Sequence, residues 1–172
     1  MNTRARRLLT AAAERYARGD LRPRPDEYAT LAGATRWMGR ALETPVSDET
    51  ARRGGGHLAE KYFVASAAGV AAFVLVRRVT AWASPLAFAL GFYAVEAQGV
   101  FVIPALLEGV DDPQARSREL VAEAGGTLSV MATVIPIAAH MLTGPLLGRG
   151  AVDAWCVGCL AVVLWYNQLA HG

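Results

Sequence analysis

Glu96 is the only charged residue between Val79 and Leu107, an apolar stretch of 29 residues. A membrane-spanning helix needs about 20 apolar residues, so this stretch is long enough to cross a bilayer. A carboxylate near the centre of such a helix is costly in hydrocarbon, so it is expected to face other helices, hold a proton or have a partner. Glu96 is therefore the candidate catalytic residue, and we expect no Lys or Arg within a span to pair with it.

Helical spacing indicates which residues accompany Glu96. Tyr93 lies about one turn before it on the same face, whereas Gln98 lies about 200° around the helix. Thr133, in a later span, could hydrogen-bond to Glu96 across the bundle. Tyr93, Gln98 and Thr133 are thus the candidate substrate-binding residues for a lipophilic molecule, or a proton, in a cavity between the helices. The structural alternative is a protonated Glu96 bonded to a hydroxyl of the third span.

Cys156 and Cys159 are the only cysteines of the chain. Their spacing places both sulfurs on one helix face, which allows a disulfide, a redox dithiol or two soft metal ligands. His140 ends the preceding span on the same side of the membrane, so a short connection could bring it near. Cys156, Cys159 and His140 form an alternative metal or thiol-redox site, with Asp153 as a fourth ligand. The plainer alternative is two small apolar residues and an unrelated histidine.

From Cys156 to about Asn167 the last span resembles that of vitamin K epoxide reductases. That family also has a four-helix membrane bundle with a Cys-x-x-Cys near the start of its last core helix. The resemblance implies reduction of a quinone at Cys156 and Cys159. The family's additional pair of loop cysteines has no counterpart here, because no other Cys exists.

Long uncharged runs, rich in Ala, Gly, Leu and Val, alternate with short polar connections after Lys61. This pattern predicts an all-α integral membrane protein, a four-helix bundle over residues 57–172. Short connections make consecutive helices antiparallel neighbours. The expected spans are about His57–Val76, Ser84–Leu107, Val121–Thr143 and Ala151–Ala170.

Residues 1–56 are predicted to form a cytoplasmic, partly amphipathic helical segment. Prolines at 23 and 25 separate a short basic helix from a second helix, and Gly54-Gly55-Gly56 marks a flexible connection to the bundle. The second helix could lie on the membrane, dock on the bundle or bind another protein. If residues 1–45 recruit a soluble partner, the protein is a non-catalytic membrane subunit or anchor.

Charge distribution predicts the topology and the partners. Eleven arginines in residues 1–53 favour a cytoplasmic N-terminus, and four spans then place the C-terminus on the same side. Attraction to anionic lipid head groups explains these arginines more simply than nucleic-acid binding. The expected partners are the lipid bilayer, a lipophilic small molecule and a protein bound by the N-terminal segment. The sequence indicates no particular cofactor or reaction.

Overall fold

Every regular element in residues 2–172, the part of the chain that the computed structural model describes, is a helix. By length and composition, α4, the segment formed by α5 and α6, α8 and α9 can each cross a membrane. The predicted all-α class is therefore confirmed, with four helical segments long and apolar enough to span a membrane, while the cytoplasmic location of the termini stays a prediction. The elements are α1 (Thr3–Ala17), α2 (Pro25–Tyr28), α3 (Leu31–Ala41), α4 (Asp48–Arg77), α5 (Ser84–Gln98), α6 (Val102–Leu107), α7 (Pro113–Glu123), α8 (Gly126–Thr143), the 3₁₀ turn η1 (Pro145–Leu147) and α9 (Ala151–Ala170).

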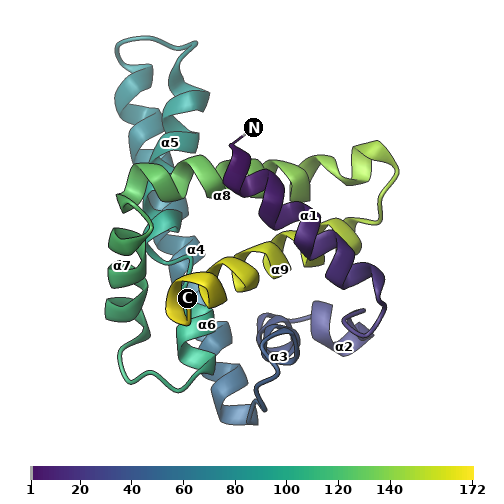
Figure 1. The fold of residues 1–172 in the computed structure, drawn as a ribbon. Coiled ribbons are helices and arrows are strands. Elements are labelled where there is room, and N and C mark those ends of the chain that lie inside the picture. The colour runs from purple at the N-terminus through teal and green to yellow at the C-terminus, as the bar shows by residue number, and fades with distance from the viewer. Residues whose placement is uncertain (1) are drawn as a thin grey trace.

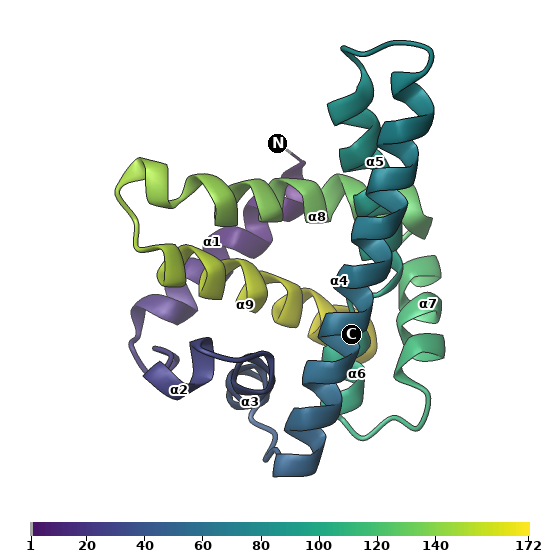
Figure 2. The same ribbon diagram turned by 180° about the vertical axis from the view of Figure 1, so that it is seen from behind.

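The four long helices form two antiparallel hairpins. In Figure 1 the α4–α5 hairpin stands upright, whereas α8 and α9 run across it, and α1 lies over α8 and α9. The view from behind shows the same crossing, with α3 beside the lower part of α4 (Figure 2). Where the hairpins cross, residues of α4, α5, α8 and α9 line a common cavity.

Small residues hold the α4–α5 hairpin together. A Cβ added to Gly69 would lie 2.9 Å from the ring of Phe88, and one added to Gly91 would lie 2.9 Å from the Ala68 carbonyl oxygen. Close backbone approach of this kind supplies the packing that lipid-embedded helices need. Large apolar side chains point outward instead, including Phe63 at 76% and Leu75 at 69% exposure.

The glycines at 54–56 do not form the predicted flexible connection, because α4 runs through them without interruption. A Cβ on Gly54 would lie 2.5 Å from the Thr35 side chain, and one on Gly55 would lie 3.1 Å from the backbone nitrogen of Ala32. These two glycines allow α3 to cross α4 closely, and that role explains their position. The domain boundary expected after residue 56 thus falls inside a continuous helix.

The third predicted span, Val121–Thr143, is divided between two helices. α7 ends at Glu123 and α8 begins at Gly126, with φ angles of +99° at Gly125 and +83° at Gly126. Glycine adopts this left-handed region without steric cost, so the chain can turn sharply here. The apolar segment that could span the membrane is therefore α8 alone.

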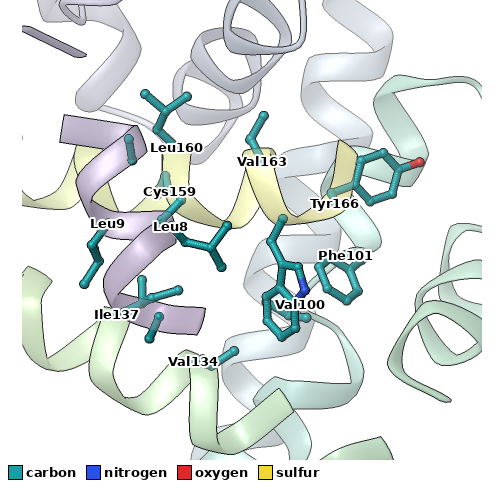
Figure 3. Close-up of a cluster of buried hydrophobic side chains, with 14 of the residues drawn as sticks. Leu8, Leu9, Val100, Phe101, Val134, Ile137, Cys159, Leu160, Val163 and Tyr166 are labelled. Atoms are coloured by element: carbon teal, nitrogen blue, oxygen red, sulfur yellow. The ribbon is translucent and has the colours of Figure 1, made fainter. Parts of the chain in front are cut away.

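The N-terminal helix docks on the protein's own core. The apolar face of α1, which includes Leu8 and Leu9, is buried with residues of α8 and α9 (Figure 3). The Asn2 side chain donates a hydrogen bond of 3.4 Å to the carbonyl of Ala132. Pro136 has no N–H to bond that carbonyl from the next turn of α8. This face of α1 is thus covered by the protein's own core, while binding of a soluble partner by the N-terminal segment stays a prediction.

Candidate functional site

Glu96 has a basic partner, contrary to the sequence prediction. Nζ of Lys61 on α4 lies 2.9 Å from Oε1 of Glu96 on α5, and the side chains are only 14% and 11% exposed. The ammonium also lies 4.9 Å from the centre of the Tyr62 ring, within the range of a cation–π interaction. Lys61 is the only lysine of the chain and stands inside the first predicted span, a signal that could have revealed it.

The second carboxylate oxygen of Glu96 is left without a partner. Oε2 is buried and accepts no hydrogen bond from any group in residues 2–172; it is the one buried side-chain polar atom in that range with no bond. Buried polar atoms are nearly always paired, so an unpaired one needs an explanation. This oxygen is a strong acceptor that no protein group in residues 2–172 satisfies.

Glu96 lines a cavity of about 310 Å³. Its wall comes from α3, α4, α5, α6, α8 and α9, and is mainly aliphatic and aromatic. Tyr93 lines it together with Glu96, as their shared helix face predicts, and Val100 and Ile103 line it from beyond the end of α5. An apolar hollow with a few polar groups is typical of a small-molecule site. The polar groups on its wall include Lys61, Tyr62, Tyr93, Glu96 and Cys159.

The helix that carries Glu96 is interrupted just beyond it, between the end of α5 at Gln98 and the start of α6 at Val102. The carbonyl of Gln98 accepts a 2.7 Å hydrogen bond from the hydroxyl of Ser117, and the same hydroxyl accepts a 3.3 Å bond from the amide of Phe101. Ser117 is fully buried and serves both sides of the gap. Broken helices occur at membrane depth only where other protein groups satisfy the backbone. Ser117 was not among the residues predicted from the sequence.

Gln98 and Thr133 do not join Glu96. The Gln98 amide donates a 2.6 Å hydrogen bond to the Thr127 hydroxyl. Thr133 donates to the Ser129 carbonyl and accepts from Asn2, at 3.2 and 3.3 Å. Neither Gln98 nor Thr133 lines the cavity. Of the three candidate substrate-binding residues, the structure brings only Tyr93 to Glu96.

The two cysteines are buried free thiols on α9. Cys159 lines the Glu96 cavity and also a neighbouring cavity of about 430 Å³, where Cys156 lies too. His140 is not with them: its Nε2 lies 3.3 Å from Nη1 of Arg149, in a different hollow. Within residues 2–172 no three His, Cys, Asp or Glu side chains are placed to hold a metal ion.

Asp153, the predicted fourth metal ligand, is hydrogen-bonded to a residue of α1. Its Oδ1 accepts a 2.7 Å hydrogen bond from the hydroxyl of Tyr16. Burial, together with this hydrogen bond, raises the pKa of Tyr16 well above its usual range. The phenol therefore stays protonated and keeps donating to the carboxylate, which ties α1 to the first turn of α9.

A second buried glutamate, Glu27, lines the neighbouring cavity. Its Oε1 accepts from Nε of Arg40 at 2.9 Å, and its Oε2 accepts from Nη2 of Arg40 at 2.6 Å and from the amide of Arg24 at 2.8 Å. Both oxygens of this carboxylate are thus satisfied by protein groups, in the paired geometry that arginine favours.

The fold and the site together define a multi-pass α-helical membrane protein with a buried ion pair on the wall of an apolar cavity. Searches of protein-family models, curated proteins and solved structures find no match to the chain. The function must therefore be argued from the site itself.

Proposed function

We propose that the protein binds a lipophilic small molecule in the Glu96 cavity, with the polar end of the molecule against the Lys61–Glu96 pair. One observation carries this proposal: the unpaired, buried Oε2 of Glu96 on the wall of a cavity of about 310 Å³. Cavities of this size fall within the range that small-molecule sites occupy.

The energetics of the pair support a binding role. Burying two charges is costly, and their attraction repays that cost only when their remaining hydrogen-bonding groups are satisfied. The acceptor on Glu96 adds a penalty of about 1–3 kcal/mol as long as no donor bonds to it. A ligand that bonds to Oε2 removes this penalty, so the site is better satisfied when it is occupied.

The cavity wall supports an apolar ligand body. Tyr62, Phe92, Tyr93 and Trp155 contribute aromatic surface, and aliphatic side chains supply much of the rest. Each square ångström of apolar ligand surface that leaves water contributes about 25 cal/mol. A lipid-soluble molecule therefore fits this lining better than a sugar or a nucleotide.

Native mass spectrometry of the detergent-purified protein tests the proposal, using Ala138→Phe and Ala139→Phe as a matched pair. Ala138 lines the Glu96 cavity, whereas its neighbour Ala139 is exposed and lines a different hollow. We expect a bound small molecule on the wild type and on Ala139→Phe, and its loss from Ala138→Phe. Equal occupancy of the two variants would place the ligand elsewhere and overturn the proposal.

A further inference from the structure

We infer that the ligand carries a hydroxyl group, as in a long-chain alcohol or a lipophilic phenol, and that this hydroxyl donates its hydrogen to Oε2 of Glu96. The inference rests on the proposed function and names the chemical class that the same cavity selects. Three features carry it: the unpaired acceptor, the remaining hydrogens of the Lys61 ammonium, and the neutrality of the pair.

A hydroxyl satisfies both members of the ion pair. Oε2 of Glu96 needs a donor, because no group in residues 2–172 supplies one. Lys61 carries three N–H donors, and its one hydrogen bond to another residue in the described chain goes to Oε1 of Glu96. A ligand hydroxyl that donates to Oε2 can at the same time accept from the ammonium. An ether or a ketone can only accept, so it would leave Oε2 unpaired.

Charge argues against ionised ligands. Lys61 and Glu96 cancel one another, so the site presents no net charge to a ligand. A carboxylate ligand would lie against Glu96 and be repelled by it, while Lys61 already serves Oε1. An ammonium ligand would be repelled by Lys61 in the same way. A neutral head group avoids both penalties.

The ligand body is elongated. The Glu96 cavity and the cavity lined by Glu27 share a wall made of Leu31, Ala34, Met38, Trp155 and Cys159. These residues come from α3 and α9, which lie side by side there. A ligand chain that starts at Glu96 and extends along this wall would be directed to the second cavity, of about 430 Å³, whose lining is mainly apolar.

The test compares three probes of equal chain length on the full, detergent-purified chain: 1-dodecanol, its methyl ether and dodecanoic acid. Binding is measured by titration in native mass spectrometry. We expect the wild type to bind the alcohol about tenfold more tightly than the ether, because the ether leaves a buried acceptor unpaired. The acid should bind no better than the ether. Equal affinities for alcohol and ether, or a preference for the acid, would overturn the inference.

Glu96→Gln provides the decisive variant. Its amide oxygen can still accept from Lys61, and its NH₂ group then replaces the unpaired acceptor with a donor. The preference for 1-dodecanol over its methyl ether should disappear or reverse, so that the ether binds at least as tightly as the alcohol. A retained tenfold preference for the alcohol would overturn the inference, and thermal unfolding shows whether the variant is folded.

Two controls separate this inference from the proposed function. Glu108→Gln changes a carboxylate that Tyr166 and His171 already bond, and it should keep the wild-type preference for the alcohol. If every probe binds wild type equally and Ala138→Phe binds none, the cavity site stands and only the hydroxyl assignment fails. If no probe binds the wild type, or Ala138→Phe binds them all as wild type does, the proposed function fails as well.

Discussion

Glu27 and Glu96 are both buried carboxylates paired with one basic side chain, and they differ in how many of their oxygens the protein satisfies. Arg40 and a backbone amide satisfy both oxygens of Glu27. Lys61 satisfies only one oxygen of Glu96. Each glutamate lines one of two adjoining cavities. In the Glu27 pair every carboxylate oxygen accepts a hydrogen bond from the protein, whereas in the Glu96 pair Oε2 accepts none.

The choice of cation explains the difference. The planar guanidinium of Arg40 meets a carboxylate with two parallel donors, so nothing remains to be bonded. The ammonium of Lys61 is a point charge that reaches one oxygen. Counting the unsatisfied atoms therefore separates an ion pair that is complete within the protein from one that leaves an acceptor unpaired. Burial does not separate them, because Glu27 is 4% exposed and Glu96 9%.

The largest expected effect comes from removing the cation of the structural pair. Arg40→Met leaves the buried Glu27 carboxylate without its two guanidinium bonds, and we expect the free energy of unfolding to fall by about 3–5 kcal/mol. Arg36→Met is the matched control, because its partner Asp48 is 82% exposed; that change should cost less than about 1 kcal/mol. Denaturant unfolding in detergent measures both. Equal costs would contradict a structural role for Glu27.

A smaller effect is expected from α3, which carries Arg40 and also forms a wall of the Glu96 cavity. In Gly54→Ala the added methyl group meets Thr35 at 2.5 Å, so α3 must shift, at a cost of about 1–3 kcal/mol. Gly56→Ala is the control: nothing lies within 4 Å of its Cβ, and alanine should stabilise the helix by up to about 1 kcal/mol. Thermal unfolding compares the two variants, and a stabilised Gly54→Ala would refute the close crossing.

Exchanging each glutamate for glutamine separates the two roles by binding rather than by stability. Glu96→Gln should lower the affinity for a lipophilic alcohol about tenfold, corresponding to about 1.4 kcal/mol. Glu27→Gln should leave the affinity of the folded protein within about twofold, because Glu27 has no unpaired oxygen to offer. Native mass spectrometry at matched protein concentration measures both. A similar loss in both variants would remove the distinction between the pairs.

The smallest effect is expected at Cys159, the cysteine that lines both cavities. Cys159→Ser replaces a thiol with a hydroxyl of similar size, and we expect the affinity for the alcohol to change by less than about threefold, or under about 0.7 kcal/mol. Cys156 lines the Glu27 cavity and not the Glu96 cavity, so Cys156→Ser should leave the affinity for the alcohol unchanged. Loss of all binding in Cys159→Ser would favour a thiol-dependent function instead.

Local patterns in the sequence predict the elements better than they predict the contacts. Apolar length identifies the four spans, and the helical repeat correctly places Tyr93 beside Glu96. The position of Lys61 opposite Glu96 depends on the register between α4 and α5. That register follows from how Gly69 and Gly91 pack against the facing helix, which no single segment encodes.

Two glycine clusters show that composition alone does not predict whether glycines interrupt a helix. Gly54-Gly55-Gly56 suggests a flexible connection by composition, yet it lies in the interior of α4 because α3 needs room to cross there. Gly125-Gly126 lies within a long apolar run that predicts one helix, yet it ends α7 and turns the chain. Gly54 and Gly55 keep helical geometry against the crossing α3, whereas Gly125 and Gly126 adopt positive φ, and composition alone does not distinguish these two outcomes.

The docking of α1 has a consequence for biosynthesis. Leu8 and Leu9 are made well before the α9 residues of the same buried cluster, such as Leu160 and Val163. The ribosome adds about 5–20 residues each second. The apolar face of α1 therefore stays uncovered for several seconds, until the residues of α9 have been translated. During that interval this face is available to the membrane surface, to chaperones and to aggregation.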